Sequence, residues 1–475
     1  MMALNPADQT FQEDLRKVLP PDTVRPLADR YLSEERGRYT GVGGFLVAPR
    51  TTEEVATIVR ACNLARIGLI PYGGGTGYVC GHVARDGPPA VILTTERMNH
   101  IGPIWPDENV LAVEAGAVLS DLHTAADCAD RLFPLSLASQ GSCRIGGNLA
   151  TNAGGVNVLR YGNTRDLCLG IEAVLGDGTV IRQLKRLRKD NTGYDIRNLL
   201  IGSEGTLGII TAARLRLFAR PHQMMTAVMA VTDPRAALSL LSLAQKHLGD
   251  TVSAFELIDR TALTFVGRTL PDIRQPFSQP PDWIVLIDHT PLRVDDGGSQ
   301  FEALFADAYE KGLVSDGVIA QSQGHSDELW KLRESIPEAN RRIGAICSHD
   351  ISLPLGEISE FIQKCQLSLA RLGTFRINCF GHLGDGNLHY NVFPADGASR
   401  HDHIGQADQI SDVVHDLCDA MGGSVSAEHG IGRAKVAALE KYADPGKIHA
   451  MRAIKAALDP LGIMNPGAVL RVDRH

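Results

Sequence analysis

The sequence lacks long apolar runs and has no excess of basic residues. No stretch approaches the ~18 consecutive apolar residues that a membrane-spanning helix needs. The start of the chain, Met1–Pro21, has no apolar core of the signal-peptide type and carries more acidic residues than a transit peptide does. Because the formal net charge is −8 at pH 7, we expect no binding to nucleic acid or to an anionic membrane. We therefore expect a cytoplasmic location.

The sequence also lacks the common short catalytic and cofactor motifs. Its nine cysteines are scattered singly, so no zinc ribbon, redox pair or iron–sulfur run is predicted, and we interpret them as reduced thiols. There is no G-x-G-x-x-G and no Walker A motif, which argues against a Rossmann domain and a P-loop. The motifs G-x-S-x-G and H-E-x-x-H are absent as well.

What is present indicates a globular α+β protein with more than one domain. The chain has 475 residues, of which 44% are hydrophobic and 21% charged, and one hydrophobic core stops growing below that length. Thr51 and Glu54 match a capping box, and the apolar positions that follow have helical spacing, which predicts a helix from Arg50 to Gly68. Asp177-Gly178 suits a turn that needs a positive φ, so the flanking runs 171–175 and 179–183 should pair as a hairpin. Further segments are expected as strands at 69–72, 91–95 and 110–114, as helices at 236–246, 357–372, 406–421 and 445–458, and as loops at 275–281 and Val294–Gly298.

Three glycine clusters occupy the first half of the chain, at residues 71–77, 140–148 and 151–155. Glycine allows a left-handed backbone and close approach of a ligand, so successive N–H groups can surround a pyrophosphate. One such cluster is as often an ordinary turn. Three together predict a site for a large nucleotide, in a fold other than the Rossmann type.

Five segments in order resemble the FAD-linked oxidases of the vanillyl-alcohol oxidase type: 71–77, 141–155, 160–162, 189–195 and 201–211. The resemblance covers nearly the whole chain and implies an α+β fold in which two subdomains hold FAD. Where covalently flavinylated members often have His, this chain has Thr76-Gly77-Tyr78, so we expect non-covalent FAD, although His82 lies nearby. The implied parts are an N-terminal segment (1–38), a FAD-binding domain (39–220), a substrate or cap domain (221–425) and a C-terminal helical segment that completes the active site (426–475).

The same resemblance implies a set of FAD-binding residues. One of them, Asn465, has an ordinary turn after a helix as its alternative interpretation. The implied residues are Pro71, Tyr72, Gly73, Gly74, Gly75, Thr76, Gly77, Ser139, Gly141, Ser142, Ile145, Gly146, Gly147, Asn148, Thr151, Ala153, Gly154, Gly155, Glu204, Gly208, Ile209 and Asn465.

A histidine and glutamate constellation follows in the second half. His382 and His389 are seven residues apart, and on one uninterrupted strand they would face opposite sides. A turn at 384–387 would redirect one imidazole so that the two converge. Glu428-His429 can add a carboxylate and a third imidazole, and two imidazoles with one carboxylate leave open positions on a catalytic metal. The alternative, structural histidines, is the commoner role for an isolated pair.

These motifs resemble the D-lactate, glycolate and D-2-hydroxyglutarate dehydrogenase branch. The resemblance implies His382, His389 and Glu428 as ligands of Zn²⁺ or another divalent metal such as Mn²⁺. It implies His429 as the catalytic base, which also contacts substrate. Arg333 matches the partner of the substrate carboxylate, a role that suits its bidentate guanidinium.

Two further positions bear on the substrate. Asn391 shares a strand face with His389, and we expect it to contact the substrate. Pro337 and Ser348 stand where members that act on 2-hydroxyglutarate have Thr and Lys. We expect Ser348 to contact the substrate, but unlike Lys it offers no positive charge to a distal carboxylate. His349, Arg341 or Arg342 are the candidates to supply that charge.

The expected activity is oxidation of a D-2-hydroxy acid, D-2-hydroxyglutarate or a relative, by hydride transfer to flavin N5. The alternatives are a D-lactate or glycolate dehydrogenase, a non-redox enzyme of the alkylglycerone-phosphate synthase branch, and a flavin carrier without catalysis. The resemblance also implies a homodimer and an electron acceptor such as an electron-transfer flavoprotein or a quinone.

Overall fold

The computed structural model describes residues 3–34, 37, 39–291 and 297–471, and it forms two compact units. Unit 1 comprises 1–155, 162–220 and 428–475, and unit 2 comprises 156–161 and 221–427. The chain therefore enters unit 2 at residue 221 and returns to unit 1 at Glu428. The segment 156–161 was not expected in unit 2. It belongs there because helix α5 (Val158–Tyr161) contacts strand β13 (Val252–Asp259).

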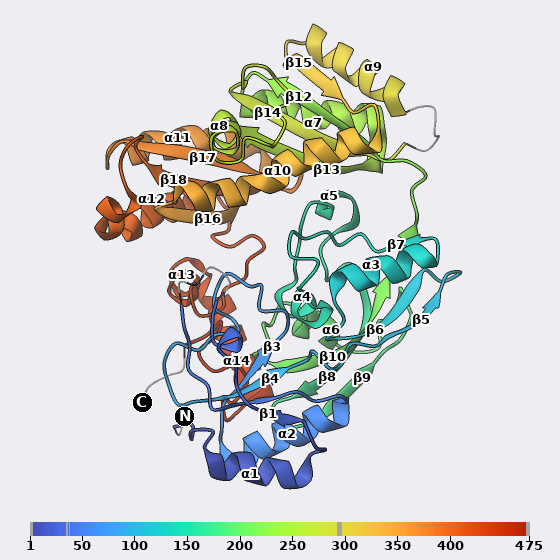
Figure 1. Cartoon of the computed structure of the whole chain (residues 1–475), viewed down its shortest axis with the longest axis vertical. Coiled ribbons are helices and arrows are strands. Elements are labelled where there is room, and N and C mark those ends of the chain that lie inside the picture. Colours follow the sequence, from blue (N-terminus) through green and yellow to red (C-terminus); the bar gives the residue numbers. More distant parts are fainter. Residues whose placement is uncertain (1–2, 35–36, 38, 292–296, 472–475) are drawn as a thin grey trace. The chain divides into compact units, whose positions relative to one another are not determined.

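Unit 1 contains two main sheets (Figure 1). Its strands are β1 (Val24–Arg25), β2 (Phe45–Val47), β3 (Leu69–Tyr72), β4 (Val91–Thr94), β5 (Ile101–Trp105), β6 (Val110–Glu114), β7 (Arg131–Leu132), β8 (Cys168–Leu175), β9 (Val180–Gln183), β10 (Gly208–Arg216) and β11 (Phe218–Ala219). The first sheet has the order β1-β2-β4-β3 and is parallel from β2 to β3, and the second is antiparallel with the order β5-β6-β10-β8-β9. β7 and β11 form a small separate pair. The predicted hairpin is confirmed as β8–β9, with Gly178 at φ 84° in its turn.

Seven helices accompany these sheets in the described part of unit 1. They are α1 (Gln9–Val18), α2 (Thr52–Ala65), α3 (Leu119–Cys128), α4 (Ile145–Thr151), α6 (Ile196–Leu200), α13 (Val436–Tyr442) and α14 (Pro445–Leu458), with a 3-10 turn, η1, at Asp29–Tyr31. Helix α2 confirms the predicted helix, and its end at Ala65 follows from the left-handed backbone of Arg66. Its capping box forms only in half: the Thr51 hydroxyl accepts the Glu54 N–H, whereas the Glu54 carboxylate accepts the N–H of Arg50 instead of Thr51.

Unit 2 is built on one seven-stranded sheet. Its strands are β12 (Met225–Val231), β13, β14 (Trp283–His289), β15 (Val314–Ile319), β16 (Cys347–Ser352), β17 (Phe375–His382) and β18 (Asn387–Pro394). Neighbouring strands are antiparallel throughout, in the order β15-β12-β14-β13-β17-β18-β16. The strands that carry the predicted metal-binding histidines, β17 and β18, are therefore direct neighbours.

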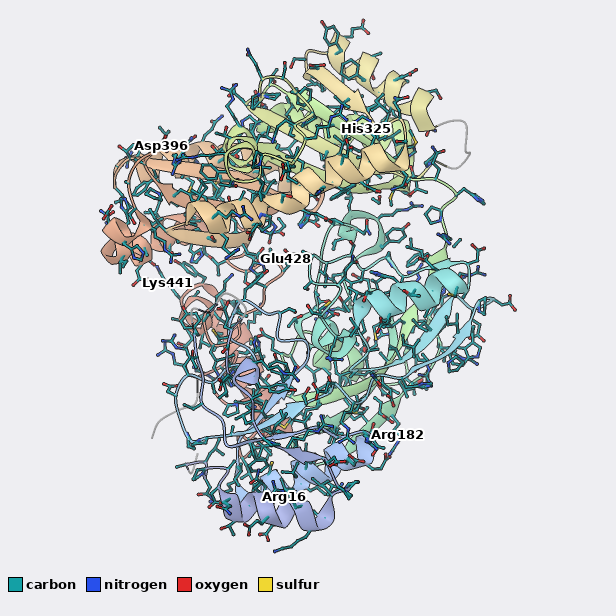
Figure 2. The ribbon with its side chains drawn as sticks, in the orientation of Figure 1. Arg16, Arg182, His325, Asp396, Glu428 and Lys441 are labelled. Atoms are coloured by element: carbon teal, nitrogen blue, oxygen red, sulfur yellow. The ribbon has the colours of Figure 1, made fainter. Side chains whose placement is uncertain are left out.

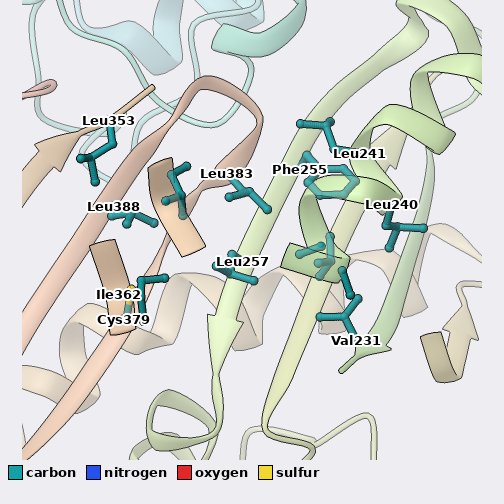
Figure 3. Close-up of a cluster of buried hydrophobic side chains, with 14 of the residues drawn as sticks. Val231, Leu240, Leu241, Phe255, Leu257, Leu353, Ile362, Cys379, Leu383 and Leu388 are labelled. Carbon is teal, nitrogen blue, oxygen red and sulfur yellow. The ribbon is translucent and has the colours of Figure 1, made fainter. Parts of the chain in front are cut away.

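Helices cover both faces of this sheet. Besides α5 they are α7 (Pro234–Leu248), α8 (Arg260–Thr269), α9 (Gly297–Glu310), α10 (Gln323–Ile343), α11 (Ile358–Ala370) and α12 (Ala407–Ala420), with 3-10 turns η2 (Gly249–Thr251), η3 (Leu355–Glu357), η4 (Leu383–Asp385) and η5 (Arg400–Gln406). Helices α7, α9, α11 and α12 share one core with residues of this sheet. Figure 3 shows part of this core, with Phe255, Leu257 and Leu388. Helices α8 and α10 pack on the opposite face against Ile258 and Phe380. We call this second side the α10 face of the sheet.

The other helices expected after residue 221 are confirmed as α7, α11, α12 and α14, to within two residues at each end. The loop expected at 275–281 is present. Of the loop expected at Val294–Gly298, residues 294–296 lie outside the described residues and α9 begins at Gly297. Charged side chains such as Arg16 and Arg182 are exposed (Figure 2). In the described residues, every helix is too short or too polar to span a bilayer.

Candidate active site

A cavity of about 290 Å³ in unit 1 gathers the glycine clusters. The loop after β3, residues 71–77, forms one wall, and Gly146, Gly147 and Gly154 form part of another. A Cβ on Gly74 would lie 2.4 Å from the carbonyl oxygen of Ser142. Only glycine therefore allows the first cluster to pack this closely against the second.

Unsatisfied polar atoms in the cavity wall fit a polar ligand. Among the described residues, His82 Nε2, Thr95 Oγ1 and Asn148 Oδ1 are buried without a hydrogen-bond partner, and all three residues line the cavity. A buried polar atom left unpaired costs free energy. Burial also lowers the pKa of His82 to about 4, so its imidazole is neutral at pH 7. The wall thus fits a ligand rich in nitrogen and oxygen atoms, as a flavin nucleotide is.

Four of the expected FAD-binding residues do not line this cavity. Ile145 is fully buried and its N–H donates to Ala117, because it begins helix α4. Gly155 is needed for its turn, where a Cβ would lie 2.1 Å from the Ser136 carbonyl oxygen. Gly141 and Ser142 belong to the exposed turn after Ser139. These four residues therefore lie outside the cavity wall, and their contact with FAD stays a prediction.

The remaining expected residues all line the cavity, together with residues that the sequence interpretation missed. Several of the missed residues directly adjoin a glycine cluster, and that proximity was the available signal. The missed lining residues are Tyr78, Val79, Gly81, His82, Thr95, Leu137, Ala138, Cys143, Arg144, Ala150, Gly205 and Ile210.

The segment that begins at Glu428, where the chain returns to unit 1, is called the returning segment. It brings Glu428 and His429 into the wall of the same cavity. The Glu428 Oε1 and His429 Nε2 atoms are 4.0 Å apart. The ring of Tyr78 lies edge-on to the His429 imidazole, with 5.2 Å between centroids. An acid and an imidazole are therefore placed together beside the expected flavin site. Glu428 is labelled in Figure 2.

Glu204 and Asn465 line the cavity, but their side-chain groups hold the chain itself. The Glu204 carboxylate accepts the N–H groups of Ile431 and Gly432, each at 2.7 Å. Burial raises the pKa of Glu204, and these two hydrogen bonds oppose the rise. The Asn465 Nδ2 donates to the carbonyl oxygens of Gly81 and Glu204, and its Oδ1 accepts from Arg433. Both residues act as clamps on the returning segment.

In unit 2, polar side chains from adjacent strands gather on the α10 face. The rings of His382 and His389 are 5.5 Å apart between centroids and nearly perpendicular, and their ligand nitrogens lie within 4.8 Å. They share this face because His389 pairs with Phe380 across the β17–β18 ladder, and Phe380 and His382 are two residues apart on β17. The predicted turn is confirmed: η4 is followed by Gly386 at φ 85°.

The sequence interpretation missed Glu256, which lies beside this pair. Its Oε1 is 2.6 Å from His382 Nδ1, and its Oε2 accepts from Arg333 Nε at 2.7 Å. The Glu256 side chain is 0% exposed and that of Arg333 is 7% exposed. Burial by itself raises the pKa of Glu256, but His382 and Arg333 outweigh burial and hold this pKa below its usual range. The signal was an acid within the apolar strand Val252–Asp259.

The other expected substrate residues lie on the neighbouring strands. Asn391 donates from Nδ2 to the carbonyl oxygens of Asn378 and His389. Ser348 pairs with Asn391 and is exposed. Asp350, two positions after Ser348, lies 3.8 Å from His389 Nδ1.

Chain connectivity links the histidine cluster of unit 2 to Glu428 and His429 of unit 1. Ala427, the last residue of unit 2, donates its N–H to the carbonyl oxygen of Asp350 at 3.3 Å. Glu428 is the next residue. The carboxylate expected as the third metal ligand thus follows directly after a residue that is hydrogen-bonded to the strand beside the histidines.

Comparisons with known proteins agree with this picture. Residues 44–183 match the family described as FAD binding domain, and residues 220–469 match FAD linked oxidases, C-terminal domain. The chain is 38% identical over 433 residues to "D-2-hydroxyglutarate dehydrogenase, mitochondrial" of Arabidopsis thaliana, covering 91% of this chain and 76% of that protein. It is 36% identical to the Bos taurus protein of the same name (96% and 81% covered) and 34% identical to D-2-hydroxyglutarate dehydrogenase of Stutzerimonas stutzeri (97% and 99% covered).

Solved structures show the same fold at low sequence identity. p-Cresol methylhydroxylase with substrate bound matches with a TM-score of 0.78 at 17% identity, over 100% of both chains. Alkyldihydroxyacetonephosphate synthase matches with a TM-score of 0.71 at 16% identity, over 98% of this chain and 86% of the other. The expected α+β fold of the vanillyl-alcohol oxidase type is confirmed.

The relatives correct the expected location. The Arabidopsis thaliana and Bos taurus relatives are named mitochondrial proteins. The prediction of a cytoplasmic location is therefore wrong: the acidic start of the chain carried less information than we assigned to it.

Proposed function

The chain belongs to the FAD-linked oxidase family, and we propose that it oxidises D-2-hydroxyglutarate or a related D-2-hydroxy acid to the 2-oxo acid. The observation that carries this proposal is the cluster on the α10 face, where His382, one of a histidine pair, and the buried Arg333 share the Glu256 carboxylate. An arginine beside two potential metal ligands suits a substrate with a carboxylate next to a hydroxyl group. The names of the relatives support the same chemistry.

We assign the proposed roles as follows. His382, His389 and Glu428 would hold a divalent ion, Zn²⁺ or Mn²⁺, which when bound acts as a Lewis acid toward the substrate hydroxyl. His429 is the general base that takes the hydroxyl proton. Arg333, whose Nε is used by Glu256, offers its two terminal nitrogens to the substrate carboxylate. FAD, when bound, would supply the hydride acceptor.

One observation favours the second candidate, a D-lactate or glycolate dehydrogenase. The three residues considered as replacements for a distal cation are directed elsewhere. Arg341 and Arg342 both bond Glu338 at the surface. His349 alternates with Ser348 on β16, so its side chain lies on the opposite side of the sheet from the α10 face. There it bonds His415. A short monocarboxylate needs no such cation.

A substrate panel tests the proposal. D-2-hydroxyglutarate, D-malate, glycolate and both lactate enantiomers are supplied anaerobically, and bleaching of the flavin is followed before turnover is measured with a dye. We expect bleaching by D-2-hydroxyglutarate and not by L-lactate. Highest kcat/KM for D-lactate or glycolate would establish the second candidate. A flavin that no 2-hydroxy acid reduces would identify a flavin carrier and contradict the proposal.

The mode of FAD attachment, the acceptor and the assembly complete the proposal. We propose non-covalent FAD, an electron-transfer flavoprotein or quinone as acceptor, and a homodimer. His82 lines the cavity and is the residue that would carry a covalent bond. Acid precipitation decides between the two: a yellow supernatant is expected, and flavin that stays with the polypeptide would contradict non-covalent binding.

A further inference from the structure

Glu256 connects two residues that the proposed function uses separately. Its two carboxylate oxygens go to different partners, one to His382 Nδ1 at 2.6 Å and the other to Arg333 Nε at 2.7 Å. It is paired directly with His382 across the β13–β17 ladder. Arg333 approaches from helix α10, with its guanidinium 4.8 Å from the centre of the Phe380 ring.

The contact with His382 has a chemical consequence. A carboxylate next to Nδ1 makes this nitrogen the protonated donor. The lone pair of the neutral imidazole is then on Nε2, which points away from the carboxylate. A histidine binds a metal through a nitrogen lone pair. Carboxylates that hold a ligating imidazole in this way fix both its tautomer and its ring orientation.

The contact with Arg333 has a second consequence. The Nε bond fixes the rotation of the guanidinium about its long side chain, while the Phe380 ring supports its plane. The side chains of Arg333 and Glu256 are both almost fully excluded from water, so water molecules do not compete for the hydrogen bond between them. The two terminal nitrogens therefore point in one defined direction.

We propose that Glu256 is a positioning residue that orients the metal ligand His382 and the substrate-binding Arg333 together. Metal affinity and substrate affinity then depend on the same carboxylate. This inference rests on the proposed function. It adds a residue that touches neither the ion nor the substrate, and a coupling between the two binding events.

The alternative is that Glu256 only stabilises unit 2 as the partner of a buried arginine. Asp288 provides a matched comparison. It is a buried acid on the adjacent strand β14, and it also bonds helix α10, through Trp330 Nε1 at 2.8 Å. Its other oxygen accepts from Thr226, and neither oxygen bonds His382 or Arg333. A purely structural role would make the two acids equivalent in binding experiments.

The test compares Glu256→Gln with Asp288→Asn in the FAD-loaded protein. Zn²⁺ affinity is measured by competition with a chromophoric chelator, and KM and kcat are measured for the best substrate of the panel. The Gln amide can accept from only one of the two partners. We expect Zn²⁺ binding to weaken by roughly 10- to 100-fold, the usual effect of losing such a carboxylate, and KM to rise. Asp288→Asn should leave both quantities unchanged.

Each result has a defined meaning. If Glu256→Gln keeps the wild-type Zn²⁺ affinity and KM, the positioning role is overturned. If Glu256→Gln does not fold, Glu256→Asp replaces it, since the shorter side chain keeps the charge but cannot reach both partners. Unchanged Zn²⁺ affinity and KM in Glu256→Asp would overturn the role equally. A wild-type protein that binds no Zn²⁺ and oxidises no 2-hydroxy acid contradicts the proposed function instead.

Discussion

The carboxylate of Glu204 accepts the N–H of Gly432 at 2.7 Å, although 228 positions separate the two residues. The same carboxylate accepts the N–H of Ile431. A Cβ on Gly430 would lie 2.8 Å from Glu204 Oε1, so the loop passes as close to the acid as glycine permits. Glu204 thus fixes the loop that begins with the proposed ligand Glu428 and the proposed base His429.

Replacement of Glu204 should loosen this loop. In Glu204→Gln one of the two N–H groups faces an amide NH₂ instead of an acceptor. We expect a loss of about 1–3 kcal/mol in the free energy of unfolding, the cost of leaving a buried donor unsatisfied, and a lower kcat. Urea unfolding of the FAD-loaded protein and steady-state turnover measure the two effects. The exposed Glu310→Gln is the control, and equal behaviour of the two variants would argue against the clamp.

The glycine clusters predict a pair of alanine variants with opposite outcomes. A Cβ on Gly74 meets the backbone of Ser142 and Cys143 at 2.4 and 2.7 Å, whereas a Cβ on Gly141 meets nothing within 4 Å. Gly74→Ala should therefore displace the loop and release FAD, while Gly141→Ala should retain it. The ratio of flavin to protein absorbance after gel filtration measures retention. Full flavin content in Gly74→Ala would show that the close packing is not needed.

His429→Asn tests the proposed base. Asn keeps a polar side chain of similar reach but cannot take a proton near neutral pH. Turnover should fall by roughly 10²- to 10⁴-fold, the usual contribution of a general base, while the flavin spectrum stays unchanged. Turnover close to that of the wild type would remove His429 from this role.

Removal of divalent metal should abolish turnover without releasing FAD. The proposed ligand set contains two imidazoles and one carboxylate, and of these residues Glu428 lines the flavin cavity whereas His382 and His389 do not. After treatment with a chelator, activity should return on addition of Zn²⁺ or Mn²⁺. Full activity in protein shown to be free of metal would reject the metal site.

Asp288 should give unfolding a characteristic pH dependence. Burial raises the pKa of Asp288 to about 6, against the hydrogen bonds from Thr226 and Trp330, which lower it. The folded state then keeps this proton after the unfolded chain has lost it. Stability from this group is complete below about pH 4 and is lost as the pH rises to about 6, by on the order of 3 kcal/mol.

Asp288→Asn isolates this contribution. The Asn oxygen can accept from Trp330 and its NH₂ can donate to the Thr226 hydroxyl, so the contacts survive without a titrating group. The free energy of unfolding of the variant minus that of the wild type should therefore rise between pH 4 and pH 7. A difference that does not change over this range would show that Asp288 is not protonated in the folded state.

Local patterns in the sequence determined the glycine-rich loops around the cavity, the β8–β9 hairpin and the turn between the two histidines. Each depends on the backbone preferences of a few consecutive residues, above all glycine at positive φ, and these preferences act wherever the segment lies. The same holds for the helices after residue 221. A glycine-rich segment does not tell which of its members line a cavity, and the structure places Gly141, Ser142, Ile145 and Gly155 outside the cavity wall.

Only the tertiary structure decided which distant residues meet. Glu256 lies 126 positions from His382, and nothing in its own segment except an acid among apolar residues marks it. Sheet register brings the two together, since strand pairing places residues side by side irrespective of their separation along the chain. The same applies to Glu204 and Gly432. A sequence specifies how each segment folds locally, whereas the partners of a buried charge are selected by the packing that excludes water from it.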